Sequence, residues 1–394
     1  MFISMNQKVQ IPLTEYKQRV QNAAAKVRER GLDVLVVNGS ESDYANTRYF
    51  SNFWPVFERC GVAVSADGRV ALMVGPESEL FAADFGVIDN VFVLREYRES
   101  ANPAYPELKP QTYNDVFKRI GVTGENIKIG VAAWLDTNVV MMDGLKEAYP
   151  KAEIIRADEI MVELRSIKSD NEIACLREAA RITQIATERV IAAIKPGMTE
   201  LQLVGVAQNA IYENGAEYEG LPMYCFSQKS TKHAISRSSY KEIQMGDIVQ
   251  LNLSAKICGY SPSIGMPLSM GKLAGEKKEL VEFGLEAHMW TEKQLKAGVI
   301  SGDVAKGFVE FFKARGYGKN FLYGPCHGLG LIEVEAPWME TNSVYPLQKN
   351  MTFQIDTFVM GSDFGLRWEK PVAITGAGID ILSEQIGTIH ELLF

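Results

Sequence analysis

The sequence predicts a mixed α/β protein of two domains, the second of which contains two related αβ halves. Its length of 394 residues exceeds the roughly 100–200 residues of a typical single domain. The first part alternates helical and strand patterns, which is typical of a mixed α/β domain. In the second part, two similar helix–turn–helix segments each precede a β-rich stretch. We therefore place the domains at residues 1–160 and 161–394.

The first domain begins with apolar residues at helical spacing over Thr14–Arg30, and this predicted helix ends at Gly31. Runs of β-branched and aliphatic residues follow, two of them flanking an Asp-Gly pair that is typical of a hairpin turn. The predicted strands are Leu32–Asn38, Gly61–Ser65, Val70–Val74, Ile127–Val131 and Ala152–Ile155. This order predicts a sheet with helices packed on it.

The second domain begins with a linker and an amphipathic helix within Leu164–Arg181, where Ser169 and Glu172 have the spacing of a capping box. A weak internal echo follows. Ile194–Leu201 and Leu295–Val304 each end one helix, turn at a glycine and begin another. This echo predicts two αβ halves packed back to back, with the functional site between them.

The stretch Gly246–Gly271 is the most informative part of the second domain. Two apolar, β-rich runs, Ile248–Leu253 and Ser261–Leu268, flank a Cys-Gly-Tyr turn, which predicts a hairpin. Each strand carries a polar but uncharged side chain, Asn252 on the first and Ser263 on the second.

Further segments carry a specific resemblance to a known family. PCHGLGLIEVEAP (residues 325–337), NMTFQIDT (350–357) and GLRWEKP (365–371) are similar to motifs of the creatinase, prolidase and aminopeptidase P family. The linker and the hairpin resemble the same family, so the resemblance covers nearly the whole chain. It implies a creatinase-like N-terminal domain with a mixed sheet, a C-terminal domain with the pita-bread fold, and a homodimer.

In most of this family, five side chains hold a pair of divalent ions. The matching positions here are Asn252, Ser263, His327, Asp356 and Glu369. His327 and Glu369 match the family ligands, and Asp356 is one methylene shorter than the usual glutamate. Asn252 and Ser263 are neutral where the family has aspartates, and divalent ions need such charge to offset lost hydration. We therefore expect no dinuclear centre and no required cofactor. The alternative is one Mn, Zn or Co ion on the three remaining ligands.

Creatinase is a member of this family that lacks the metal ions, and the chain shares features with it. Creatinase also has an asparagine at the position of Asn252. Its Phe-x-Arg motif holds the substrate carboxylate, and Phe57 and Arg59 match that motif. Its acid/base histidine lies in a loop that corresponds to the loop of His233. Gly265 replaces a creatinase glutamate, which argues against creatine as the substrate.

The resemblance also implies a substrate-binding role for Glu335. It follows Val334, which stands where the family usually has a second histidine. Burial in this apolar setting is costly for a carboxylate that has no charged or hydrogen-bonding partner. We expect Glu335, Asp356 and Glu369 to converge and therefore to need positive charge nearby. Without metal ions, a cationic substrate group could supply that charge through paired hydrogen bonds.

These features predict the hydrolysis of a C–N bond in a small amidine, guanidine or amide. In this hypothesis His233 moves a proton between water and the leaving nitrogen. Asp356 and Glu369 hold the electrophilic carbon through its nitrogens, and His327 positions the water. Two alternatives stay open. One is a metallopeptidase of the Xaa-Pro type with a single ion and Asn252 as a weak ligand, and the other is a non-catalytic binding protein.

Composition narrows the possible partners and location. The net charge is −8 and no basic stripe appears, so nucleic acid is not expected as a partner. No apolar run has the length of a membrane span, so no membrane partner is expected either. The 5 cysteines are scattered without a CxxC pair, which indicates a reducing compartment and favours the cytoplasm. The expected partner is a small-molecule or short-peptide substrate.

Overall fold

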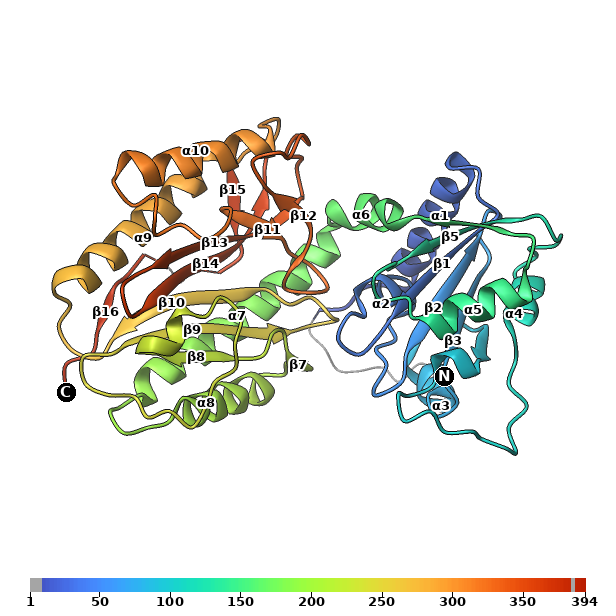
Figure 1. Cartoon of the computed structure of the whole chain (residues 1–394), viewed down its shortest axis with the longest axis horizontal. Helices are drawn as coiled ribbons and strands as arrows, with labels where there is room; N and C mark the ends of the chain where they lie inside the picture. Colours follow the sequence, from blue (N-terminus) through green and yellow to red (C-terminus); the bar gives the residue numbers. More distant parts are fainter. Residues whose placement is uncertain (1–8, 384–386) are drawn as a thin grey trace. The chain divides into compact units, whose positions relative to one another are not determined.

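The computed structural model describes residues 9–383 and 387–394 and divides the chain into two units, Met1–Arg165 and Ser166–Phe394 (Figure 1). The division falls at the end of helix α6 (Asp158–Ser166). The domain boundary predicted at residue 160 lies inside this helix, a few residues before the division. Each unit has its own sheet and its own core.

The described residues of the first unit form a mixed sheet with the strand order β4-β3-β2-β1-β5-β6. Strand β2 is antiparallel to both β1 and β3, whereas β1, β5 and β6 run parallel to one another. The strands are β1 (Val34–Gly39), β2 (Cys60–Ser65), β3 (Val70–Val74), β4 (Val91–Val93), β5 (Lys128–Ala132) and β6 (Glu153–Arg156). All five predicted strands therefore exist, and the predicted Asp-Gly turn joins β2 to β3.

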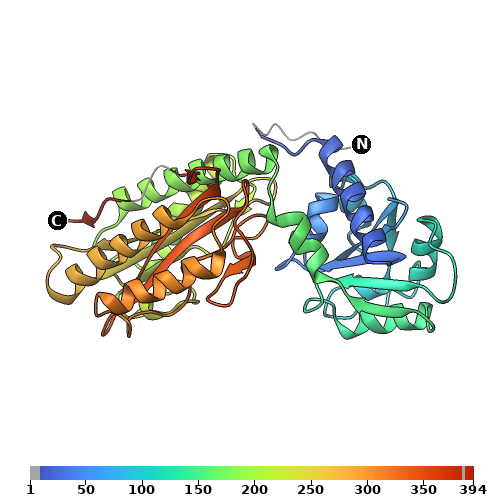
Figure 2. The ribbon, with the colours of Figure 1, turned by 90° about the horizontal axis from the view of Figure 1, so that it is seen from above.

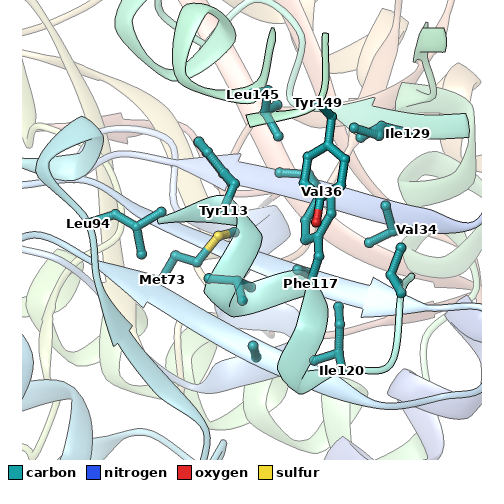
Figure 3. Close-up of a cluster of buried hydrophobic side chains, with 14 of the residues drawn as sticks. Val34, Val36, Met73, Leu94, Tyr113, Phe117, Ile120, Ile129, Leu145 and Tyr149 are labelled. Carbon is teal, nitrogen blue, oxygen red and sulfur yellow. The ribbon is translucent and has the colours of Figure 1, made fainter. Parts of the chain in front are cut away.

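Helices cover both faces of this sheet. They are α1 (Leu13–Glu29), α2 (Ala45–Ser51), α3 (Glu79–Phe85), α4 (Tyr113–Arg119) and α5 (Val139–Ala148), with a short 3-10 turn, η1 (Arg95–Tyr97). Figure 3 shows the core on one face, where Val34 and Val36 of β1 pack with Phe117 of α4 and Leu145 of α5. The rings of Phe117 and Tyr149 stack with their centroids 4.9 Å apart. Full burial of each large apolar side chain contributes about 1.5–3 kcal/mol.

The second unit is built around a 10-stranded sheet whose main path is β12-β11-β13-β14-β10-β9-β7 in the described residues. Its strands are β7 (Tyr218–Glu219), β8 (Tyr224–Ser227), β9 (Ile248–Lys256), β10 (Ser263–Ser269), β11 (Cys326–Gly328), β12 (Glu335–Met339), β13 (Thr352–Met360), β14 (Gly365–Ile374), β15 (Ile379–Ile381) and β16 (His390–Glu391). Its helices are α7 (Asp170–Ala193), α8 (Glu200–Glu213), α9 (Gly275–Gln294) and α10 (Ser301–Ala314), with a 3-10 turn, η2 (Gln228–Lys232).

The predicted capping box at the start of α7 is confirmed, because the Ser169 side chain accepts from the Glu172 backbone and the Glu172 side chain accepts in return. Helices α7 and α8 lie against β8 and β9, and α9 lies against β13 and β14 with α10 beside it. Figure 2 shows α9 and α10 running side by side. None of the helices in the described ranges combines the length and apolar character that crossing a bilayer requires.

The internal sequence similarity corresponds to two turns with the same backbone conformation and the same kind of hydrogen bond. Gly197, between α7 and α8, has φ 85°, and Gly298, between α9 and α10, has φ 90°. The N–H of Gly197 donates to the Ile243 carbonyl at 2.9 Å, and the N–H of Gly298 donates to the Leu347 carbonyl at 2.8 Å. Glycine suits this left-handed backbone because it has no β-carbon. The prediction of two related αβ halves is therefore confirmed.

Candidate functional site

The predicted hairpin is present as the antiparallel pair β9–β10. Asn252 lies opposite Gly265, and Ser254 lies opposite Ser263. Side chains two residues apart on a strand point to the same face of a sheet. Asn252 and Ser263, the two neutral replacements, therefore lie on one face. Both are fully buried.

The register of the neighbouring strands places the predicted carboxylates beside this pair. Gly265 on β10 lies opposite Glu369 on β14, and Glu369 lies opposite Asp356 on β13. One row across the sheet therefore contains Asn252, Gly265, Glu369 and Asp356. His327 on β11 pairs with Gln354, two residues before Asp356, and so joins the next row on the same face. The predicted residues of β9, β10, β11, β13 and β14 converge as one buried polar cluster.

Arg367 belongs to this cluster and was missed by the sequence interpretation. It lies two residues before Glu369 on β14, and its guanidinium faces both carboxylates. Nε lies 3.5 Å from Asp356 Oδ1, and Nη1 lies 3.4 Å from Glu369 Oε1. Burial alone would lower the pKa of Arg367, but Asp356, followed by other acidic neighbours, outweighs burial and raises it. A permanent positive charge therefore lies among the carboxylates.

Glu333 is the second missed member. The Ser263 hydroxyl lies within hydrogen-bonding distance of both Glu333 Oε1, at 3.1 Å, and Glu369 Oε2. Burial raises the pKa of Glu333 to about 7. Burial and the Asp356 carboxylate raise the pKa of Glu369, and burial raises that of Asp356. Because Ser263 has one proton for two acceptors, a proton on Glu333 or Glu369 completes the hydrogen bonding.

His327 has a defined tautomer in this cluster. Its Nδ1 lies 3.0 Å from the Gly328 carbonyl oxygen, which can only accept a hydrogen bond. In the neutral ring, Nδ1 therefore carries the hydrogen and Nε2 keeps its lone pair. Nε2 lies 3.9 Å from Glu333 Oε1. The lone pair is thus available to accept a proton or to bind an electrophile.

Glu335, predicted to bind substrate, has a protein partner. Its Oε1 accepts from Lys168 Nζ at 2.8 Å, and the two side chains are only 6% and 2% exposed. The pair supplies the positive charge that a carboxylate in this apolar setting needs. Val334, where the family usually has a histidine, is 44% exposed.

His233 lies in the loop 228–239, and this loop is bonded to the cluster. The carbonyl of Ala234, the next residue, accepts from Arg367 Nη2 at 2.8 Å. His233 is exposed, with Nδ1 3.3 Å from the Ser236 hydroxyl. His233 is therefore one residue away from a backbone carbonyl that contacts Arg367. The catalytic role of His233 stays a prediction.

Glu200, at the start of α8, fixes both ends of this loop. Its Oε1 accepts from the Ser227 backbone N–H and hydroxyl and from the Ser230 hydroxyl. Its Oε2 accepts from the Ser239 backbone N–H and hydroxyl. The carboxylate is fully buried, so these hydrogen bonds are protected from water. Hydrogen bonds to a charged acceptor are also stronger than those between neutral groups.

Glu200→Gln is expected to loosen the loop. Glutamine has an NH₂ group in place of one carboxylate oxygen. That group cannot accept the hydrogen bonds that N–H and O–H donors make to this oxygen in the wild type. We expect the free energy of unfolding to fall by about 3 kcal/mol and amide exchange across residues 228–239 to accelerate. Hydrogen-exchange mass spectrometry measures this. The control is Glu242→Gln, at an exposed position; equal effects of the two variants would contradict the proposed role of Glu200.

Phe57 and Arg59, the predicted substrate-carboxylate motif, belong to the first unit. Phe57 is 77% exposed and has φ 59°. The backbone N–H of Arg59 donates to the Tyr97 carbonyl at 2.9 Å. Their role in substrate binding stays a prediction. In residues 9–383 and 387–394, no group of three or more His, Cys, Asp and Glu side chains is arranged to hold a metal ion.

Comparisons with known proteins agree with the family resemblance. A family model described as Metallopeptidase family M24 matches residues 174–376, and one described as Creatinase/Prolidase N-terminal domain matches residues 19–167. An X-Pro aminopeptidase structure from Thermotoga maritima MSB8 superposes with a TM-score of 0.80 at 22% sequence identity. That match covers 94% of this chain and 99% of the other, and it confirms the fold.

Two curated relatives extend the comparison. An Xaa-Pro dipeptidase of Pyrococcus furiosus is 24% identical over 378 residues, which cover 96% of this chain and 100% of the relative. The uncharacterized peptidase YqhT of Bacillus subtilis is 27% identical over 230 residues, which cover 58% of this chain and 65% of YqhT. The chain thus spans somewhat less than two thirds of YqhT. The names of both relatives describe peptidases, which agrees with the predicted hydrolysis of C–N bonds. They support the alternative prediction of a peptidase, and they give no support to an amidine or guanidine substrate.

Proposed function

The chain belongs to metallopeptidase family M24, and on that premise we propose that it hydrolyses a C–N bond of a small-molecule or short-peptide substrate without a pair of metal ions. The observation that carries this proposal is the guanidinium of Arg367, which lies within 3.5 Å of the Asp356 and Glu369 carboxylates.

The residues present do not fit a pair of divalent ions. Asn252 and Ser263 are uncharged, so the donor set lacks two of the carboxylates that such ions prefer. The positive charge of Arg367 further opposes a second and third positive centre within a few ångströms. In this proposal the side chains therefore supply the chemistry.

Arg367 also changes the expected roles of Asp356 and Glu369. The sequence predicted that these carboxylates would hold a cationic group of the substrate. Because Arg367 already provides a cation to both, a cationic substrate group is not required as their counter-charge. Their proposed role is to fix Arg367 and, for Glu369, to exchange a proton with Ser263 and water.

General acid–base catalysis by the buried carboxyl groups fits this arrangement. A carboxyl group with a pKa of about 7, as burial gives Glu333, can accept and donate a proton at neutral pH. Its neighbour His327 presents the Nε2 lone pair and can share that proton. Water adds to the electrophilic carbon, the C–N bond breaks, and the proton removed from water passes to the leaving nitrogen. His233 is the second candidate for this transfer.

Glu333→Gln is expected to reduce turnover by about 100-fold or more, since a positioned acid–base group contributes roughly 10²–10⁴-fold. The assay is a panel of N-acyl amino acids, dipeptides and guanidino acids with chelator-treated protein. The matched control is Glu340→Gln, an exposed glutamate of the same segment. Hydrolysis that chelation abolishes and Mn²⁺ restores would overturn the metal-free proposal, and unchanged turnover in Glu333→Gln would overturn the role of Glu333.

An Xaa-Pro dipeptidase with a single ion is the second candidate function. Two observations favour it: the named relative from Pyrococcus furiosus and the His327 tautomer, which leaves Nε2 able to bind a metal ion. His327, Asp356 and Glu369 are the residues that would hold the ion, although the described residues contain no group of three such side chains arranged as a metal site. The ion would polarise the peptide carbonyl. Calorimetric titration of chelator-treated protein with Mn²⁺ or Zn²⁺, beside assays on Xaa-Pro dipeptides, distinguishes the candidates, because only this one predicts stoichiometric binding that is needed for turnover.

A further inference from the structure

We propose that the side-chain NH₂ of Asn252 binds the carbonyl oxygen of the substrate, so that the scissile group is an amide rather than a guanidinium or amidinium. This inference rests on the proposed function and specifies its substrate class. Asn252 is fully buried. Its Oδ1 accepts from Gln250 Nε2 at 2.9 Å, whereas its Nδ2 has no hydrogen-bond partner among the described residues. A buried donor without a partner is costly, and a ligand that accepts from it removes the cost.

The orientation of the Asn252 amide follows from a chain of hydrogen bonds that begins at the backbone. The Arg367 N–H can only donate, and it donates to Gln250 Oε1 at 2.7 Å. Gln250 Nε2 must then be the donor, and its two hydrogens are shared among three acceptors at 2.9 Å, which are the carbonyl oxygens of Leu251 and Arg367 and the Asn252 Oδ1. Reversing Gln250 would break all of these bonds. Asn252 therefore presents its oxygen to Gln250 and its NH₂ group away from it.

The free NH₂ group lies next to the acid–base residues. A β-carbon at Gly265 would stand 2.6 Å from Asn252 Nδ2 and 2.7 Å from Glu369 Cβ. Any larger residue at this position would collide with both side chains as they lie here. Asn252 Nδ2 and the Glu369 side chain thus both lie beside Gly265. A substrate atom that binds one of them is therefore close to the other.

A fixed NH₂ donor discriminates between scissile groups. Guanidinium and amidinium cations present only donors, and a metal ion needs a lone pair, which an amide NH₂ group does not offer. An amide carbonyl presents an acceptor oxygen. When water adds to its carbon, that oxygen gains negative charge and its hydrogen bond to Nδ2 strengthens, which favours the transition state. The C–N bond then breaks and the proton from water leaves with the amine.

Two isosteric probes test this inference. N-acetylglycine and guanidinoacetate have the same shape and carboxylate, but the first has an amide carbonyl where the second has a guanidinium. We expect wild-type protein to bind N-acetylglycine at least about tenfold more tightly in calorimetric titration. Asn252→Asp, which presents an acceptor instead, should reverse this preference.

Gln250→Glu provides a second variant that leaves Asn252 in place. A glutamate can still accept from the Arg367 N–H but cannot donate to Asn252 Oδ1, so the Asn252 amide should turn and the preference for N-acetylglycine should fall to about equal binding. Circular dichroism checks that each variant is folded. Wild-type preference for guanidinoacetate, or binding of neither probe, would overturn the inference. Preferred binding of N-acetylglycine without turnover of any amide would support the donor role and count against the proposed hydrolysis instead.

Discussion

Replacing Arg367 by methionine is expected to lower the free energy of unfolding by about 3–5 kcal/mol at pH 8, the usual cost of breaking a buried ion pair by removing one partner. Methionine keeps much of the length of the arginine side chain but has no charge. The Asp356 and Glu369 carboxylates, which Arg367 faces at 3.5 and 3.4 Å, would then be buried beside each other without a cation. Their mutual repulsion adds to the cost of burial.

The loss should depend on pH in a defined direction. Burial already raises the pKa of Glu333 to about 7 and also raises those of Asp356 and Glu369. A carboxyl group with a raised folded-state pKa stabilises the fold fully below its unfolded pKa, and this contribution is lost as pH rises through the folded value. Arg367 opposes these raised values, so its removal raises them further. The difference between wild type and Arg367→Met should therefore grow from pH 5 to pH 8.

Urea unfolding of chelator-treated protein at several pH values measures this difference. The control is Arg237→Met, because Arg237 is exposed in the loop 228–239 and its removal leaves no carboxylate buried without charge. A loss that stays equal at pH 5 and pH 8, or one that Arg237→Met reproduces, would show that Arg367 stabilises the fold by packing and not by its charge.

The strand pattern of the second unit made much of this site predictable from the sequence. The hairpin followed from two β-rich runs around a turn, and the family motifs placed Asn252, Ser263, His327, Asp356 and Glu369 on strands. Because side chains alternate between the faces of a strand, residues at matching register were bound to share a face. Arg367 could have been found in the same way, since it lies two residues before Glu369 on a continuous strand.

Other members could not be predicted in this way. Glu333 lies in an irregular segment between β11 and β12, where no periodicity tells which side chains turn inward. Lys168 pairs with Glu335 across 167 positions of the chain, a contact that depends on tertiary packing. The direction of the Asn252 amide depends on Gln250 and on one backbone N–H of β14. Sequence motifs identify residue types, whereas hydrogen-bond directions need the assembled sheet.

The double variant Asn252→Asp/Ser263→Asp is expected to bind Mn²⁺ at least about 100-fold more tightly than wild type. It restores both carboxylates at positions where the family holds its ions, and each added ligand charge should contribute about tenfold in affinity or more. The carboxylate introduced by Asn252→Asp would still accept from Gln250 with one oxygen and would present its other oxygen over Gly265, beside Glu369. Without metal, two more buried negative charges should lower the melting temperature.

Calorimetric titration with Mn²⁺ and thermal unfolding with and without the ion measure both effects together. Binding to the folded state alone stabilises it by about 2.7 kcal/mol when the ion is at 100 times its dissociation constant, so Mn²⁺ should restore the lost melting temperature only in the double variant. The control, Asn114→Asp/Ser42→Asp, adds the same charges at exposed positions of the first unit and should not gain affinity. If wild type instead binds two Mn²⁺ ions per chain as tightly as the double variant, the neutral side chains at 252 and 263 do not prevent a dinuclear centre, and the metal-free proposal fails with them.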